Sequence, residues 1–185
     1  MSERVKEDAT YDDVIEAPAD RIAEISGGDL YLSPRPAPRH ARATAALMSD
    51  LHDAFDRGRS GPGGWWVLFE PELHLGGDVV VPDIAAWRRI RLASLPDEAW
   101  FNLAPDWVCE ILSPSTRDFD RFNKMPAYAA AGVGHLWLVD PRTKRLDVFR
   151  QAEGSWTIAE TFAGAVNVVA EPFEAIEVEL ARLWA

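Results

Sequence analysis

The sequence predicts one domain of the α/β or α+β class, built on a mixed β-sheet flanked by helices. The chain has 185 residues, enough for a single domain with a substantial apolar core. Apolar runs of strand length alternate with two long segments of helical periodicity, and no internal repeat interrupts them. Residues 1–9 are polar, so we expect them to be disordered and residues 10–185 to form the domain.

The first half of the chain is expected to form two hairpins with a helix between them. Residues 21–25 and 30–32 flank a glycine-containing turn and predict the first hairpin. Residues 39–57 have the period of an amphipathic helix, and residues 65–75 and 78–87 predict the second hairpin. The apolar stripe of the helix is formed by Ala43, Leu47, Leu51 and Phe55.

The turn of the second hairpin is Gly76-Gly77, which also sets the pairing of its two strands. With these glycines as the loop, Glu70 faces Asp83, provided that no bulge shifts the register. Two carboxylates directly opposite on one face repel each other unless a cation lies between them. Glu70 is therefore either a third carboxylate of a cation site or a solvated strand residue.

The second half of the chain is expected to continue the sheet. A loop or short helix at 88–103 precedes the strand 107–112, and a helix follows from about 116 to 131. Pro126 should kink this helix, because it cannot donate a hydrogen bond to Phe122. The remaining predicted strands are residues 135–139, 144–150, 156–162 and 175–179.

Glu110 is a carboxylate inside the apolar strand 107–112. Burying it is costly unless a cation or hydrogen bonds compensate its charge. Asp83 has a similar setting, directly after the apolar residues 79–82. Two acids on two core strands indicate a divalent metal site with oxygen ligands, which suits Mg²⁺ and also Mn²⁺.

Each of these acids also has a simpler interpretation. Asp83 could be an aspartate at a strand end, and Pro105-Asp106 is a rival to its Pro-Asp dipeptide. Glu110 could be a buried glutamate paired with an arginine such as Arg117 or Arg121.

Lys124 lies on the helix after the Glu110 strand, which can fold back over the Glu110 face. There it would orient or deprotonate an attacking water and stabilise charge on a phosphate, with Asp120 as a partner behind the site. The metal would lower the pKa of that water. Alternatively, Lys124 forms an i,i+4 ion pair with Asp120 on an exposed helix face.

The formal net charge of −11 argues against non-specific adhesion to a polyanion. Nucleic acid remains possible as a substrate, because a bound metal and local arginines can offset this charge. Two groups of arginines are candidates for phosphate contacts, although both could equally be solvated. The first group is Arg88, Arg89 and Arg91, and the second is Arg35, Arg39 and Arg42.

Localisation is expected to be cytoplasmic. The longest apolar runs are too short to span a bilayer, and residues 1–8 contain no hydrophobic signal core. Cys109 is the single cysteine, which excludes an intramolecular disulfide and is typical of a reducing compartment.

The chain also resembles the Uma-type family, described as "putative restriction endonucleases" within the PD-(D/E)XK nuclease superfamily. The resemblance is carried by Pro82-Asp83, Glu110 to Thr116, Asp120, Lys124, Tyr128, Ala131 to Val133, and Trp137 to Pro141. Glu24 and His40 also match positions of the family, without an assigned role. In the superfamily the lysine is expected two residues after the second acid, where Leu112 stands, whereas the Uma-type pattern places it on the following helix.

This resemblance implies a restriction-endonuclease-like core with a Mg²⁺ site. Asp83, Glu110 and the Ile111 carbonyl would bind the metal, and Lys124 would be the catalytic lysine. The expected activity is metal-dependent hydrolysis of phosphodiester bonds, with double-stranded DNA as the implied substrate. Cutting two strands favours a homodimer with twofold symmetry.

Two alternatives from other classes stay open. One is a non-catalytic binding or scaffold module that keeps the nuclease fold. The other is a metal-dependent hydrolase of a small phosphoester, which would show a narrow closed pocket instead of an open groove.

Overall fold

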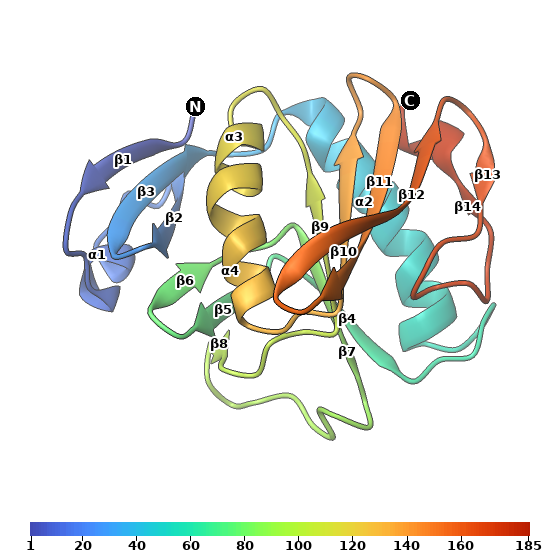
Figure 1. Cartoon of the computed structure of the whole chain (residues 1–185), viewed down its shortest axis with the longest axis horizontal. Helices are drawn as coiled ribbons and strands as arrows, with labels where there is room; N and C mark the ends of the chain where they lie inside the picture. The colour runs from blue at the N-terminus through green and yellow to red at the C-terminus, as the bar shows by residue number, and fades with distance from the viewer.

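A central six-stranded sheet lies between two helical segments (Figure 1), in a computed structural model that describes residues 1–185. Its strand order is β12-β11-β10-β9-β7-β4, and all neighbours are antiparallel except β9 and β10. The strands are β4 (Trp65–Phe69), β7 (Ile84–Arg88), β9 (Trp107–Ile111), β10 (His135–Asp140), β11 (Arg145–Ala152) and β12 (Ser155–Ala163).

A second sheet, formed mainly by the N-terminal part of the chain, has the order β1-β3-β2-β6-β5-β8. Its strands are β1 (Glu3–Lys6), β2 (Arg21–Ser26), β3 (Asp29–Pro34), β5 (Glu72–Leu75), β6 (Asp78–Val80) and β8 (Trp100–Phe101), with the short helix α1 (Tyr11–Ile15) after β1. The C-terminal segment adds the pair β13 (Asn167–Val168) and β14 (Val178–Glu179), followed by the 3-10 helix η3 (Leu180–Leu183).

β1 lies within the residues that the sequence predicted to be disordered. The structure pairs it antiparallel with β3, where Glu3 is opposite Leu32 and Arg4 is opposite Tyr31. All four residues of β1 are exposed, so backbone pairing with β3 holds the strand in place. A strand without a buried face has no apolar alternation, which explains why the pattern did not reveal it.

The predicted hairpin around Gly76-Gly77 has the expected register, but it is divided between the two sheets. β5 pairs with β6 near the turn, and β4 pairs with β7 further away, both in the same register. Between these pairs lie Pro71 and Pro82, which cannot donate ladder hydrogen bonds. The two prolines therefore mark the point where the strands leave one sheet for the other.

The first long helix matches its prediction closely. It comprises α2 (Pro38–Leu51) and a π-helical turn, η1 (His52–Asp56). Its predicted apolar stripe of Ala43, Leu47, Leu51 and Phe55 is fully buried. These residues pack with Cys109, Ile111 and Trp137 on one face of the central sheet, together with the C-terminal segment.

The second long helix covers the opposite face of the central sheet (Figure 1). It is formed by α3 (Arg117–Phe119), the π-helical turn η2 (Asp120–Lys124) and α4 (Met125–Ala130). In η2 the Met125 N–H donates to the Asp120 carbonyl, five residues earlier. The sequence predicted a kink at Pro126; the structure has a π-helical turn directly before it, a common adjustment where proline interrupts α-helical bonding.

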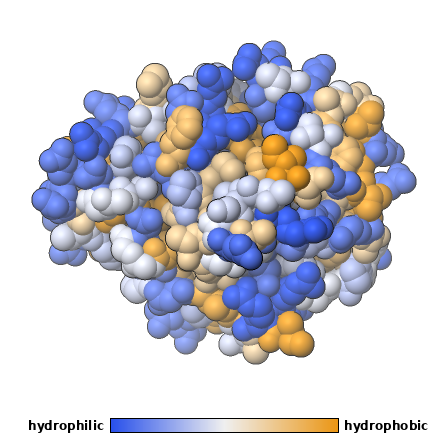
Figure 2. Space-filling view, in the orientation of Figure 1, coloured by the Kyte–Doolittle hydropathy of each residue, from blue (hydrophilic) through white to orange (hydrophobic).

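Figure 2 shows that hydrophobic residues on the viewed face form small groups separated by hydrophilic ones. No helix is both long enough and apolar enough to cross a lipid bilayer.

Candidate active site

Three acids, Glu70, Asp83 and Glu110, lie where β4 and β9 end and β7 begins. Phe69 of β4 pairs with Ile84 of β7. Glu70 follows Phe69, Asp83 precedes Ile84, and these two residues stay paired because the Glu70 N–H donates to the Asp83 carbonyl at 3.1 Å. Ile84 also pairs with Cys109 of β9, so the same register extended by one residue sets Asp83 beside Glu110. The predicted opposition of Glu70 and Asp83 is therefore confirmed, although Glu70 has a φ of +45° and lies outside the strand.

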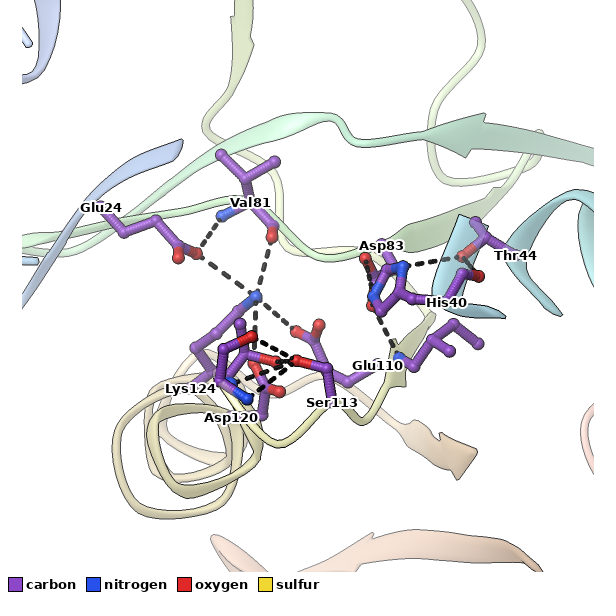
Figure 3. Close-up of polar contacts among 12 residues, drawn as sticks. Glu24, His40, Thr44, Val81, Asp83, Glu110, Ser113, Asp120 and Lys124 are labelled. Atoms are coloured by element: carbon purple, nitrogen blue, oxygen red, sulfur yellow. Dashed lines mark hydrogen bonds and ion pairs between the residues drawn. The ribbon is translucent and has the colours of Figure 1, made fainter. Parts of the chain in front are cut away.

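Asp83 connects the central sheet to the first turn of α2 (Figure 3). Its Oδ2 accepts the Ile111 N–H at 2.6 Å, so this side chain takes the place of a backbone acceptor beside β9. Nε2 of His40 lies 3.0 Å from Oδ1 and 3.1 Å from Oδ2. Burial lowers the pKa of His40, but the hydrogen bond and charge of Asp83 outweigh it and leave the pKa raised.

Glu110 is 1% exposed, in agreement with its place in an apolar strand. Its Oε1 accepts the Tyr128 hydroxyl at 2.6 Å and lies 2.9 Å from the Lys124 ammonium. Burial raises the pKa of Glu110 to about 7, although the charge of Lys124 opposes the rise. Both contacts use Oε1, which leaves Oε2 without a hydrogen-bond partner.

Lys124 is 3% exposed, so the alternative that placed it on an exposed helix face is wrong, although the i,i+4 ion pair with Asp120 is present. Its ammonium donates to the Val81 carbonyl at 2.8 Å and is surrounded by three carboxylates. It lies 2.9 Å from Glu110, 3.3 Å from Glu24 and 3.7 Å from Asp120. Burial alone would lower the pKa of Lys124, but Glu110 and Glu24 raise it well above its usual value.

Asp120 and Glu70 complete the group of acids. Asp120 is buried at the start of η2, where burial and the charge of Glu110 raise its pKa well above the usual range. Its contact with Lys124 fits the predicted place behind the site. The pKa of Glu70 is also raised, first by burial and then by the nearby charge of Asp83.

The first arginine group lies away from these acids. Arg88 is at the opposite end of β7 from Asp83, about 16 Å along the strand. Arg89 stacks on Trp66 and pairs with Asp56, and Arg91 pairs with Asp106. Their predicted role in phosphate binding gains no support from these contacts, which tie Arg89 and Arg91 to the fold.

The second arginine group is better placed. Arg35 lines the same small cavity as Asp83, Glu110 and Lys124, and its side chain is anchored by a 2.6 Å hydrogen bond to the Ala19 carbonyl. Arg39 and Arg42 lie on the exposed side of α2 near its start. None of the three forms an ion pair, so their charges are free to meet an anion.

The cavity between these groups has a volume of about 40 Å³. This is enough for water or an ion, but too small to enclose a phosphoester. A much larger groove of about 1140 Å³ runs along α2 and shares His40 with the cavity. The narrow closed pocket expected for a small-phosphoester hydrolase is therefore not found at the acids.

The ligand set fits Mg²⁺ by its chemistry. No three His, Cys, Asp or Glu side chains converge closely enough to hold an ion by themselves. Mg²⁺ usually binds one or two carboxylates and completes its shell with water and substrate phosphate. Such an incomplete, all-oxygen site is suited by three features. Asp83 and Glu110 are adjacent, Oε2 of Glu110 has no hydrogen-bond partner, and buried acids outnumber buried cations.

The comparisons with known proteins identify the family and the fold. Residues 8–182 match the model of the Uma2 family, described as "Putative restriction endonuclease". The chain belongs to the Uma2 family. The restriction-endonuclease-like family resemblance found in the sequence is thereby confirmed.

A solved structure supports the fold of this Uma2 chain. It is a crystal structure described as a "putative nuclease belonging to DUF820" from Anabaena variabilis, with a TM-score of 0.76 and 22% identity. The similarity covers 95% of this chain and 97% of the other, which confirms the predicted mixed α/β fold and its single domain. No curated protein matches the chain significantly.

Three residues acquire contacts in the Uma2 site that the sequence alone did not assign. Glu24 accepts the Val81 N–H at 2.8 Å, His40 contacts Asp83, and Tyr128 donates to Glu110. All three match family positions, and this was the only sequence signal for them. Their partners lie 57, 43 and 18 residues away, so periodicity and local spacing carry no trace of these contacts.

Proposed function

We propose that this protein is a metal-dependent endonuclease that hydrolyses phosphodiester bonds, with double-stranded DNA as its substrate. The observation that carries the proposal is the pair of acids Asp83 and Glu110 on adjacent strands, with a buried lysine in contact with Glu110. Membership of a family described as restriction endonucleases supports the same activity.

In this proposal Asp83, Glu110 and the Ile111 carbonyl bind Mg²⁺ or Mn²⁺. When bound, the ion supplies a water of lowered pKa and neutralises charge on the phosphate. Asp83 is already oriented by the Ile111 N–H and by His40. Glu110 is held through Oε1 by Tyr128 and Lys124, which would leave Oε2 for the ion. Glu70, which lies opposite Asp83, would be a further carboxylate for the ion.

Lys124 contributes its positive charge beside Glu110. Three carboxylates surround the ammonium and keep it charged, so we assign it to stabilising negative charge in the transition state rather than to removing a proton. Asp120 holds Lys124 from the helix side.

The substrate reaches the acids from outside the small cavity. Arg35 lines the cavity, and Arg39 and Arg42 are exposed near the start of α2. We assign phosphate contacts to these cations, which would locally offset the net charge of −11. Cleavage of both strands requires two sites, which we assign to a homodimer. A reducing cytoplasm suits the single buried cysteine.

Nicking of supercoiled plasmid DNA tests the proposal. Purified wild type is compared with Asp83→Asn, Glu110→Gln and Lys124→Met, each with Mg²⁺, Mn²⁺ or EDTA. We expect metal-dependent nicking that both acid variants lose. Asp106→Asn is the matched control, because Asp106 also follows a proline but pairs with Arg91 at 2.9 Å, away from the acids.

The outcomes separate the proposal from the scaffold alternative. Retained nicking in Asp83→Asn or Glu110→Gln would remove these residues from the site. A wild type that neither nicks DNA nor binds Mg²⁺ or Mn²⁺ in calorimetry would favour a non-catalytic module with this fold.

A further inference from the structure

Glu24 is a buried acid that reaches the site from the second sheet. It lies on β2, and its side chain is only 4% exposed. Figure 3 shows its carboxylate pointing toward Val81 and Lys124, away from the strand that carries it. An acid this deeply buried needs compensating partners, and its two partners belong to different elements.

The contacts of Glu24, Val81 and Lys124 close into a ring. Oε1 of Glu24 accepts the Val81 N–H at 2.8 Å, and the Val81 carbonyl accepts the Lys124 ammonium at 2.8 Å. The third side of the ring is the 3.3 Å ion pair between Lys124 and Oε1 of Glu24. Both backbone polar groups of Val81 are therefore used by side chains of the ring.

Val81 lies in the segment that presents Asp83 to the site, so the ring affects the position of that acid. Residues 81–83 carry the chain from β6 of the second sheet to β7 of the central sheet. Pro82 cannot donate a hydrogen bond, so Val81 is the last residue before Asp83 with a backbone N–H that can anchor the crossing. The ring thus fixes the segment that presents Asp83 and, at the same time, the ammonium that contacts Glu110.

We propose that Glu24 is a positioning residue of the active site, and that through it the second sheet holds both Lys124 and the crossing to Asp83. Its catalytic consequence rests on the proposed nuclease function, whereas the ring itself can be tested by stability. Glu24 also lines the small cavity beside Asp83 and Glu110, but its carboxylate contacts Val81 and Lys124, and in this proposal it acts through these two residues.

The charges predict an unusual double-mutant cycle. In the wild type the carboxylate of Glu24 compensates the buried ammonium, so Glu24→Gln should destabilise the fold. Glutamine still offers an oxygen to the Val81 N–H, which isolates the loss of charge. In Lys124→Met the ammonium is absent and Glu24 becomes an uncompensated buried charge, so the same substitution should now stabilise the fold.

The experiment measures urea unfolding of wild type, Glu24→Gln, Lys124→Met and the double variant. A reversal in the sign of the Glu24→Gln effect between the two backgrounds supports the ring. An effect of equal sign and size in both backgrounds overturns it. Glu72→Gln is the matched control, because Glu72 lies in the same sheet and contacts Tyr11 and His74 instead of Lys124.

Activity then tests the positioning role. At a temperature where all variants are folded, Glu24→Gln should lower the nicking rate about tenfold or more without weakening Mg²⁺ binding, while Glu24→Ala should weaken both. Glu24→Gln should cause no further loss in the Lys124→Met background. Wild-type activity in Glu24→Gln, or an additional loss in Lys124→Met, would overturn the role.

The nuclease function and the positioning role of Glu24 can fail independently. If the wild type does not nick DNA, the proposed function fails and the stability cycle alone decides the ring.

Discussion

Nε2 of His40 lies 3.0 Å from Oδ1 of Asp83, which joins the first turn of α2 to the acid that precedes β7. On the other side of the ring, Nδ1 of His40 lies 3.5 Å from the Thr44 hydroxyl, which also donates to the His40 backbone carbonyl at 3.0 Å. The imidazole is therefore held on both sides, and it limits the positions available to the Asp83 carboxylate. Groups that orient a metal ligand in this way often control its affinity.

We predict that His40→Ala lowers Mg²⁺ affinity about 10- to 100-fold, because Asp83 loses the group that orients it. Isothermal titration calorimetry measures this directly. His40→Gln retains a side-chain donor and should recover part of the affinity. The control is His52→Ala, on the turn that continues α2, where the imidazole is 42% exposed and 3.9 Å from Asp56. Equal Mg²⁺ affinities in His40→Ala and wild type would exclude this role.

Tyr128→Phe should destabilise the protein by about 1–3 kcal/mol, because Glu110 is buried and loses a hydrogen-bond donor. Chemical denaturation of wild type and variant gives the difference in the free energy of unfolding. Tyr31→Phe is the matched control: the Tyr31 ring packs against Phe119, and its hydroxyl has no hydrogen-bond partner. A loss of the same size in both variants would mean that the Glu110 contact contributes nothing.

Mg²⁺ should stabilise the folded protein, since the proposed site exists only when β7 and β9 are paired. At a Mg²⁺ concentration about 100-fold above Kd, the expected gain is about 2.7 kcal/mol. Thermal melts with Mg²⁺ and with EDTA measure it. Asp83→Asn and Glu110→Gln should lose the shift, while Asp106→Asn should keep it. A shift that persists in both acid variants would place the ion elsewhere.

The sequence predicted those parts of the site that depend on local rules. The Gly76-Gly77 turn fixed the register, and the register placed Glu70 opposite Asp83 as observed. Glu110 was recognisable because a carboxylate in an apolar run is costly without a partner. The burial of the stripe along α2 followed from helical periodicity alone.

The parts that the sequence left open depend on tertiary contacts and on the direction of the strands. Arg88, Arg89 and Arg91 follow the Asp83 strand in the sequence and were candidates for phosphate contacts. However, β7 separates Arg88 from Asp83, which lie at opposite ends of the strand. Lys124 was open to an exposed or a buried interpretation, because helical position alone does not tell which face the second sheet covers. The burial of Lys124 became clear only once Glu24 and Val81 were seen to surround it.

His135 on β10 provides a pH test that is independent of the proposed metal site. Burial lowers the pKa of His135, the charges of Arg150 and Arg88 act in the same direction, and Glu171 opposes them. A histidine with a lowered pKa binds fewer protons in the folded state than in the unfolded state. Neutral His135 therefore contributes its full stabilisation of the fold above the pKa that it has in the unfolded state, about 6.5. This contribution is lost as the pH falls through the lower pKa of the folded state.

We therefore expect the free energy of unfolding of wild type, relative to His135→Gln, to decrease as the pH falls below about 6.5. Urea titrations of both proteins at several pH values measure this difference. Other groups titrate in both proteins, so subtraction isolates His135. His52→Gln serves as the control, because its imidazole is 42% exposed on η1. A difference between wild type and His135→Gln that stays constant with pH would show that burial of this imidazole does not resist protonation.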